Sequence, residues 1–357
     1  MKRLFLFLLL ATTLPAQMPQ RPLRPVSTFS IVARDPQTGE IGVAVQSHWF
    51  AVGQIVPWAE AGVGAVATQS FVDPSYGKLG LDLMRAGKAP SEALMGLLQA
   101  DQSCGVRQVA MIGTGGQAAT YTGSSDIEAA GGVVGSNPTT WSVYSCNAKQ
   151  GGKLRIGTDY AVQANLMSND KVWPAMAKAY EESKGDLAER MLAALDAAQS
   201  VGGDIRGRQS AALIVVKAKS SGKPWEDRIF DLRVDDAPEP LKELRRLVAL
   251  QRAYNHMNAG DLAVEHKDNE GALREYAAAE QLAEKTEGVP ASRLAEMRFW
   301  HAVALASMKR VDESLPIFQK VFAGPDGANW RELVGRLPHS ELLPDDAGLV
   351  KRIQAVK

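Results

Sequence analysis

The uneven distribution of glycine and charge along the chain is the strongest constraint on its fold. Of its 40 basic and 40 acidic residues, 35 lie in the last 121 positions, whereas only 7 of its 32 glycines lie there. A weakly charged, glycine-rich part is typical of strands and turns, and a charged part rich in Ala, Leu and Glu is typical of helices. The sequence therefore predicts a β-containing domain at 28–236 and a helical domain at 237–357.

The composition excludes several classes of protein. The formal net charge is zero, so the chain has no basic field for binding nucleic acid. The chain has five histidines, four of them in the helical domain, and two cysteines. We therefore expect no metal site in the first domain. We also expect no cofactor, because the chain lacks a Walker phosphate loop. Residues 62–67 match a loose dinucleotide fingerprint, but Thr-Gln-Ser follows them instead of a helix.

The first 16 residues predict an export signal. A positive start at 2–3 precedes an apolar run at 4–10, which is too short to span a bilayer, and Ala16 offers a small residue before a cut. Residues 17–27 contain three prolines and predict an extended leader. We expect a protein exported to the periplasm or the extracellular space, without membrane attachment once the signal is removed.

The two cysteines lie in the part that would fold after export. In an oxidising compartment Cys104 and Cys146 either form a disulfide or remain two separate thiols. Free exposed thiols are uncommon in exported proteins, which favours the disulfide.

Hydrophobic periodicity divides the first domain into runs of strands and pairs of helices. We predict strands at 28–34, 41–45, 62–68, 106–112, 117–122, 160–166, 210–217 and 228–234, and helices at 75–86, 90–100, 169–182 and 186–200. Residues 123–158, rich in Gly, Ser and Asn, give no clear assignment. Because the strands come in runs, the order argues against a doubly wound parallel sheet and favours antiparallel sheets covered by helices.

Two segments of the helical domain resemble each other. Residues 271–276 and 313–318 each place Leu and an aromatic residue three apart, and they are offset by 42 positions. This pattern favours two tetratricopeptide repeats, whose usual period is about 34 residues, over an ordinary set of helical hairpins. Since two repeats rarely bury a continuous core, we expect the domain to dock on the first domain or on a second subunit. It would then offer a surface to a protein partner, and a homodimer is one expected assembly.

Several long runs in the first domain permit comparison with a known family. They are 28–35 (TFSIVARD), 42–47 (GVAVQS), 50–53 (FAVG), 56–69 (VPWAEAGVGAVATQ), 76–77 (YG), 161–166 (AVQANL), 202–204 (GGD), 206–213 (RGRQSAAL) and 231–236 (DLRVDD). Over residues 28–236 the chain resembles the domain of unknown function 1028 family, which is assigned mostly by fold to the N-terminal-nucleophile (Ntn) hydrolase superfamily. The resemblance implies an α+β fold, a four-layer αββα sandwich, followed here by the all-α tetratricopeptide-like domain.

The resemblance makes Thr28 the candidate nucleophile. Ntn hydrolases attack with the Thr, Ser or Cys that opens the first strand, and the α-amine of the same residue is the general base. A free α-amine has a pKa of about 7.7–8.0, so no histidine is needed. Here a second cut, between Ser27 and Thr28, is required to free that amine. The alternative is that Thr28 is only a β-branched residue of a strand.

Three other residues complete the candidate catalytic set. Asn165, at a strand end, either donates its side-chain amide to an oxyanion or serves a turn. Asp204 precedes Gln209 and Ser210 in a Gly-rich segment, and with Arg206 it forms either a pair that orients the amine or binds a substrate carboxylate, or a structural pair. Ser210 is the third member.

The remaining candidates concern substrate binding. His48 either binds substrate or caps a strand end, and Glu60 and Asp73 are either site carboxylates or solvated loop charges. Residues 46–48 contain no acid, although proteasome-like relatives place a carboxylate beside the nucleophile there. Residues 122–146 also depart from the segment that relatives usually carry after the third hairpin.

Two hypotheses of function follow. The leading one is an exported hydrolase that cleaves an amide bond of a small amide or peptide substrate through Thr28. The alternative is a non-catalytic secreted protein that binds a ligand or a partner protein on the same scaffold.

Overall fold

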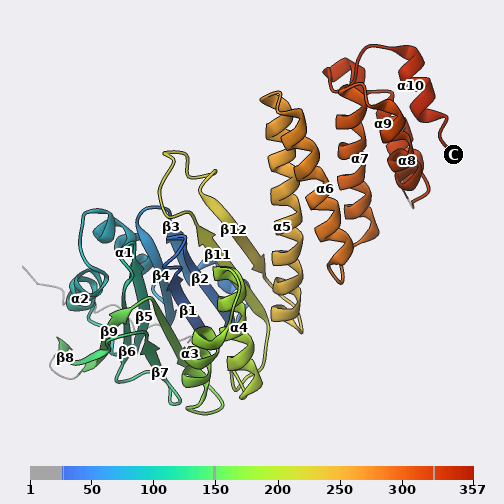
Figure 1. Ribbon diagram of the computed structural model, residues 1–357. Coiled ribbons are helices and arrows are strands. Elements are labelled where there is room, and N and C mark those ends of the chain that lie inside the picture. Colours follow the sequence, from blue (N-terminus) through green and yellow to red (C-terminus); the bar gives the residue numbers. More distant parts are fainter. Residues whose placement is uncertain (1–25, 27, 148–149, 325) are drawn as a thin grey trace, which may run out of the picture.

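The computed structural model describes residue 26 and residues 28–147, 150–324 and 326–357 (Figure 1). The predicted signal at 1–16 and the predicted leader, except Val26, lie outside the described residues, so both stay predictions. Within the described part no helix is long and apolar enough to cross a membrane.

Two six-stranded sheets form the centre of the first part of the chain, and all their strand pairs are antiparallel. The first, here called the β1 sheet, has the order β12 (Arg228–Val234), β11 (Ser210–Val216), β2 (Ile41–Ser47), β1 (Thr28–Arg34), β10 (Tyr160–Asn165) and β7 (Gly131–Val134). The second, the β4 sheet, has the order β3 (Pro57–Glu60), β4 (Gly64–Ser70), β5 (Arg107–Gly113), β6 (Gln117–Gly123), β9 (Gln150–Thr158) and β8 (Thr139–Asn147).

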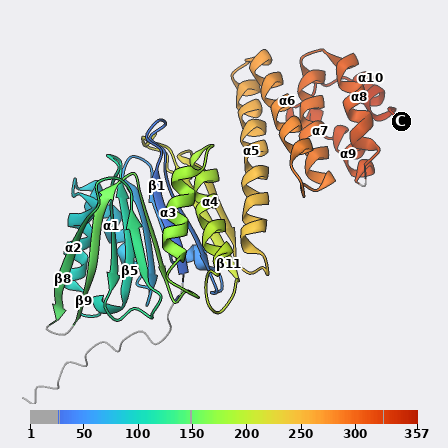
Figure 2. The ribbon, with the colours of Figure 1, turned by 60° about the horizontal axis from the view of Figure 1, so that its bottom comes forward.

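The sheets face each other, and a pair of helices covers each outer face (Figure 2). The β4 sheet carries α1 (Ser75–Arg85) and α2 (Pro90–Ala100), and the β1 sheet carries α3 (Val172–Glu182) and α4 (Leu187–Ser200). The order of layers is therefore helices, sheet, sheet, helices. The expectation of antiparallel sheets covered by helices is confirmed.

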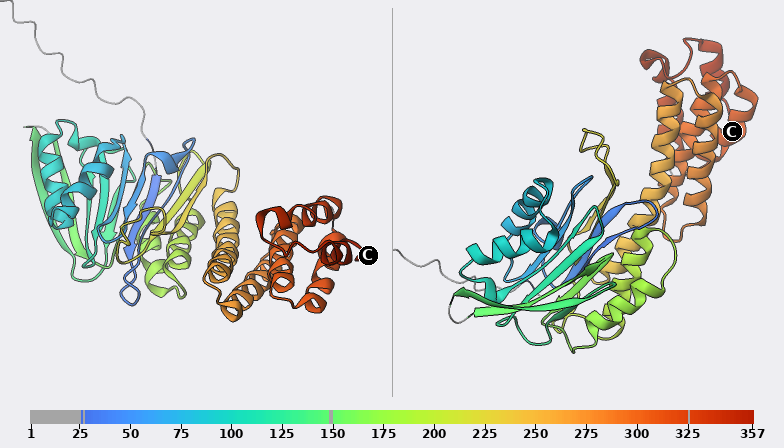
Figure 3. Two further views of the ribbon diagram at one scale, coloured as in Figure 1. Left: turned by 90° about the horizontal axis from the view of Figure 1, so that it is seen from above. Right: turned by 60° about the vertical axis from the view of Figure 1, so that its left-hand side comes forward.

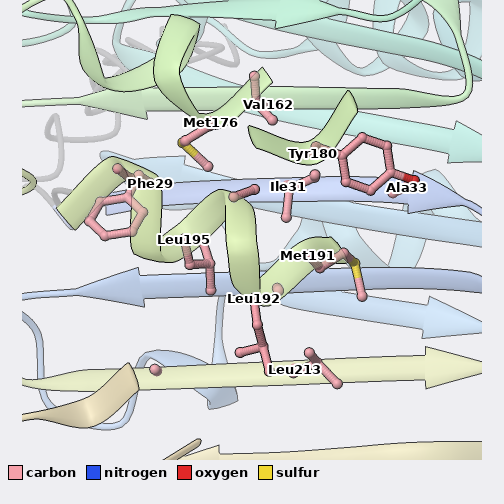
Figure 4. Packing of buried hydrophobic residues seen from close by; sticks show 14 of the residues in the cluster. Phe29, Ile31, Ala33, Val162, Met176, Tyr180, Met191, Leu192, Leu195 and Leu213 are labelled. Carbon is pink, nitrogen blue, oxygen red and sulfur yellow. The ribbon is translucent and has the colours of Figure 1, made fainter. Parts of the chain in front are cut away.

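Three apolar cores fill the three interfaces between these layers. Phe29, Ile31 and Leu213 point from the β1 sheet toward α3 and α4, where they meet Leu192 and Leu195 (Figure 4). Alternate residues of the same strands, such as Val32 and Val43, point to the β4 sheet, since side chains alternate along a strand. A third cluster lies between the β4 sheet and its helices.

The predicted elements of the first domain agree with the structure except in glycine-rich or very short segments. The strands β7, β8 and β9 lie in the segment without an assignment, and β3 has only four residues and begins with a proline. Glycines leave β7 and β9 without an apolar pattern, because the packing there leaves no room for side chains, whereas β8 contains no glycine. A Cβ at Gly152 would lie 2.4 Å from the Thr122 carbonyl oxygen, and one at Gly157 would lie 2.9 Å from the Val134 side chain. The expected strand at 160–166 ends at Asn165, because Leu166 has φ of 56°.

From residue 240 the chain is helical. The helices are α5 (Pro240–Glu265), α6 (Asn269–Lys285), α7 (Ala291–Ser307), α8 (Val311–Phe322), α9 (Gly327–Val334) and α10 (Ala347–Gln354). Short 3₁₀ helices in the described part of the chain are Val52–Gln54, Cys104–Val106 and Leu337–Ser340. Helices α5 and α6 pack as one pair and α7 and α8 as the next. Tyr276 of α6 lies on Gly260 of α5, where a Cβ would be 3.0 Å from its ring. Phe299 and Phe318 join α7 to α8 with ring centroids 5.9 Å apart.

The helical part meets the sandwich through α5, which lies along α4, β11 and β12 (Figure 3). Arg252 binds Glu189 and Asp186, each at 2.7 Å, and Arg245 binds Glu189 at 2.9 Å. These partly exposed pairs add little energy individually, but they fix the position of α5 on α4.

Two helical glycines provide a test of this packing. A Cβ at Gly77 of α1 would lie 2.3 Å from the Trp58 ring of β3, whereas one at Gly96 of α2 would meet nothing within 4 Å. We expect Gly77→Ala to lower the free energy of unfolding by about 1–3 kcal/mol through overpacking. Gly96→Ala should raise it by about 0.5–1 kcal/mol, because alanine loses less entropy in a helix. Urea denaturation measures both, and equal stabilisation by the two changes would contradict the described contact of α1 with β3.

Candidate functional site

A row of polar side chains crosses the β1 sheet at the start of β1. Thr28 is in register with Asn165 of β10 and with Ser47 of β2, and Ser47 is in register with Ser210 of β11. Register partners share a face of a sheet, and this face is the one toward the β4 sheet. All four side chains are completely buried. The fold therefore brings three predicted catalytic residues, Thr28, Asn165 and Ser210, into one row.

The hydroxyl of Thr28 has two neighbours. Its Oγ1 lies 3.0 Å from the carbonyl oxygen of Val26 and 3.2 Å from Oγ of Ser47. Ser47 is thus the residue of 46–48 that lies beside Thr28. Gln46 is in register with Phe29 and faces the helices on the other side of the sheet. The position beside the candidate nucleophile consequently carries a hydroxyl.

A buried network of amides holds the backbone of Thr28 between the sheets. Nε2 of Gln69 donates to the Thr28 carbonyl oxygen at 3.0 Å and to Oε1 of Gln108 at 2.7 Å. Nδ2 of Asn165 donates to the same Oε1 at 2.9 Å, and Nε2 of Gln108 donates to the Ala164 carbonyl oxygen at 2.9 Å. Buried polar groups that are hydrogen-bonded together define one arrangement of the strands that carry them. The network therefore joins β1 and β10 to β4 and β5 at this end.

A second set of hydrogen bonds extends the network to the next inward-facing residues along the strands. Oγ of Ser30 donates to Oε1 of Gln69 at 2.6 Å. Oγ1 of Thr120 donates to Oε1 of Gln163 at 2.9 Å, and Nε2 of Gln163 donates to the Ala67 carbonyl oxygen at 3.0 Å. These glutamines are not among the site residues predicted from the sequence. The available signal was a glutamine on the inward face of an otherwise apolar strand, as in 106–112 and 160–166.

The chain just before Thr28 is part of the core. Val26 is completely buried, and its backbone exchanges two hydrogen bonds with Ser70, of 2.6 and 3.1 Å. Oγ of Ser70 donates to Oδ1 of Asp126 at 2.7 Å, and the Gly123 N–H donates to Oδ2 at 3.2 Å. Burial raises the pKa of Asp126 to about 8 despite these two hydrogen bonds. Asp126 is a further residue near the site that the sequence analysis did not select.

Asp204 and Arg206 form the predicted charged pair. The Asp204 carboxylate is completely buried, and the Arg206 guanidinium donates to it through Nε at 3.2 Å and Nη2 at 3.0 Å. The His48 backbone N–H donates to the same carboxylate at 3.1 Å. The pair therefore fastens the loop after β2 to the loop before β11. A role toward the substrate amine or carboxylate stays a prediction.

Ser210 and His48 lie around this junction. Oγ of Ser210 donates to the Trp49 carbonyl oxygen and accepts from the Val52 N–H at 3.2 Å. The imidazole of His48 is half-buried beside Gly207. In this arrangement the Ser210 hydroxyl holds the segment 49–52 in place.

The two predicted binding carboxylates lie apart from each other. Asp73 follows β4 by three residues, close to the end that carries Ser70, and lies 3.7 Å from Arg107. Glu60 is in register with Gly64 at the opposite end of β4, about 20 Å away at 3.3 Å per strand residue. Its carboxylate accepts from Nε of Arg85 at 2.9 Å. The structure does not bring Glu60 to the row around Thr28.

Cys104 is buried under the β4 sheet, with its Sγ 3.7 Å from the Tyr121 hydroxyl. The side chain of Cys146 lies outside the described residues, so the disulfide stays a prediction. Within the part of the chain that the structure covers, no group of three or more His, Cys, Asp or Glu side chains is placed to hold a metal ion.

Comparison with known proteins gives the family. The sequence profile described as a family of unknown function, DUF1028, matches residues 28–142 and 132–244. A crystal structure of a protein from Silicibacter pomeroyi, described with the same family, is similar to this chain with a TM-score of 0.50 and 28% sequence identity. The similarity covers 62% of this chain and 84% of the other. A search of curated proteins found no match. The chain belongs to the DUF1028 family.

The carboxyl of Asp126 gives a test of the site by pH. Its ordinary pKa is 3.8 and its pKa in the folded chain is about 8, so between these values the native state binds a proton that the unfolded state releases. Stability should therefore fall as the pH rises through this range. Asp126→Asn should flatten this fall in urea denaturation at a series of pH values. The exposed control Asp345→Asn should keep it, and an equally steep fall in Asp126→Asn would contradict the assignment.

Proposed function

We propose that this protein is an amide-bond hydrolase of the Ntn type, with Thr28 as nucleophile. The proposal rests on the position of Thr28. It is the first residue of β1 and lies on the face of the β1 sheet that is turned toward the β4 sheet. Its hydroxyl lies 3.2 Å from Ser47, and Asn165 is in register with it on the neighbouring strand. The order of layers, helices on both outer faces of two antiparallel sheets, agrees with the αββα sandwich of that superfamily.

The reaction needs a cut between Ser27 and Thr28. The cut frees the α-amine and separates Val26, which is buried and whose carbonyl oxygen accepts from the Thr28 hydroxyl. The substrate could then approach along the side that Val26 covers. The predicted proline-rich leader behind the predicted export signal supports this order of events, and we propose the periplasm or the extracellular space as the location.

Thr28 supplies both groups that take part in the proton transfers, the hydroxyl and the α-amine. The neutral α-amine takes the proton of Oγ1 as this oxygen attacks the substrate carbonyl carbon, and the ammonium then gives that proton to the leaving amine. Water, deprotonated by the same amine, attacks the acyl ester and restores the Thr28 hydroxyl. The Asn165 Nδ2–H and the Ser47 hydroxyl are the candidate donors to the oxyanion. The substrate class is a small amide or peptide.

For the helical part we propose a tetratricopeptide-like repeat pair that binds a protein partner. The support is the repeated helix pairing, in which Tyr276 packs on Gly260 in the first pair and Phe318 on Phe299 in the second. We also propose that the protein forms a homodimer.

A second function is favoured by one observation. Val26 is completely buried and paired with Ser70, so the uncut chain is well packed around Thr28. If the cut does not occur, the protein is a secreted binding protein on the same scaffold.

Activity measurements on the exported protein test the nucleophile. Thr28→Ala should lower amide hydrolysis by about 10³-fold or more in a library of small amides and dipeptides, because it removes the attacking oxygen. Thr28→Ser keeps a hydroxyl and should retain measurable turnover. Thr38→Ala, in an exposed turn, should match the wild type.

The pH profile distinguishes an amine base from other bases. For the wild type, kcat/KM should rise with pH to a plateau with a midpoint of about 7.7–8.0, because only the neutral amine accepts the proton. Equal turnover by Thr28→Ala and the wild type would exclude Thr28 as nucleophile and leave the binding function.

A further inference from the structure

A buried glutamine on the other face of the β1 sheet faces a cavity that the Thr28 site does not use. Gln46 of β2 is completely buried, and neither Nε2 nor Oε1 of its side chain has a hydrogen-bond partner among the residues that the structure describes. Oε1 of Gln199, at the end of α4, is in the same situation. Both residues line one cavity of about 410 Å³. A buried amide without partners is unfavourable, so these groups are the ones that a bound molecule would satisfy.

The cavity lies between the sandwich and the first long helix. Gln46 and Gln199 come from the sandwich, and Leu241, Lys242 and Arg245 come from α5. Because Gln46 is in register with Phe29, it points toward the helices, whereas Thr28 points toward the β4 sheet. The two sites are therefore on opposite faces of the same sheet.

The charges around the cavity leave one cation in excess. Among the residues that line it, Arg208 pairs with Glu239 and Arg245 pairs with Asp196; Arg245 also pairs with Glu189, which does not line the cavity. Lys242 is exposed and forms no ion pair within the described residues. The other five charged residues line the cavity, so a ligand with one negative charge matches it.

We propose that this cavity binds a small carboxylate that carries an amide group, the chemical class of N-acylated amino acids. The ligand carbonyl oxygen accepts from Nε2 of Gln46, and the ligand N–H donates to Oε1 of Gln46 or Gln199. The ligand carboxylate pairs with Lys242. A volume of about 410 Å³ is within the range of small-molecule sites. Since both the sandwich and α5 contribute to the site, the ligand also strengthens their contact.

Isothermal titration with N-acetylglycine tests the proposal on the full chain. The wild type should bind N-acetylglycine at least 10-fold more tightly than acetate, which lacks the amide, or acetamide, which lacks the carboxylate. Gln46→Leu should weaken N-acetylglycine binding at least 10-fold. Lys242→Met should weaken it several-fold and remove most of its salt dependence. The matched control Lys285→Met, on an exposed residue of α6, should bind as the wild type does.

Thermal unfolding separates a binding role of Gln46 from a structural one. Without ligand, Gln46→Leu should be at least as stable as the wild type, because leucine leaves no buried polar atom without a partner. With N-acetylglycine, the Tm of the wild type should rise and that of Gln46→Leu should not. Lys242→Met carries the test if Gln46→Leu does not fold.

Three results would overturn the proposal. They are no binding of N-acetylglycine by the wild type, equal binding of acetate and N-acetylglycine, and unchanged binding by both Gln46→Leu and Lys242→Met. None of these measurements depends on Thr28 or on hydrolysis, so this proposal and the proposed hydrolase fail or stand separately.

Discussion

At the end of the sandwich that carries Thr28, the structure depends on hydrogen bonds between the side-chain amides of Gln69, Gln108 and Asn165. They bind the Thr28 carbonyl oxygen and fasten β1 and β10 to β4 and β5. Apolar side chains alone would also hold the two sheets together, but they would allow small shifts of one sheet against the other. Directional bonds in a dry interior permit one arrangement. The position of the Thr28 backbone is fixed by these bonds, and the proposed role of Thr28 depends on that position.

The two faces of the β1 sheet carry different polar residues. The face toward the β4 sheet carries Thr28, Ser47 and Asn165, while the other face carries Phe29 and Gln46 against the helices. The register of β1 with β2 therefore places a candidate nucleophile on one face of the sheet and a candidate ligand-binding amide on the other face. The helical part depends on this sheet as well, since α5 packs along β11 and β12.

The architecture could be predicted from the sequence where periodicity is strong. The strand pair at 28–47 and the helices at 75–100 follow from alternating or helical spacing of apolar residues, and the rejected dinucleotide fingerprint is β4 in the structure. The strand β9 could not be predicted, because glycines such as Gly152 replace the apolar residues that mark a strand. The reason, close packing against Thr122, is a contact between distant segments.

The candidate site was predictable only in its residue types. Thr28, Asn165 and Ser210 could be selected from the sequence, but their common row depends on the register of four strands, two of which are far apart in the chain. The predicted strand at 62–68 already separates Glu60 from Asp73, which flank it, but the sequence does not show which of its ends lies near Thr28. The inward glutamines interrupt otherwise apolar strands, but their common network depends on how the two sheets face each other, and Asp126 belongs to a segment without a periodic signal.

The central claim is that Thr28 becomes the first residue of the working protein. Intact mass and N-terminal sequencing of the protein recovered after export test it most directly. The account predicts a single chain that begins at Thr28, with the free α-amine in place. A fully active exported protein that begins at Gln17, or at any residue before Thr28, would contradict it.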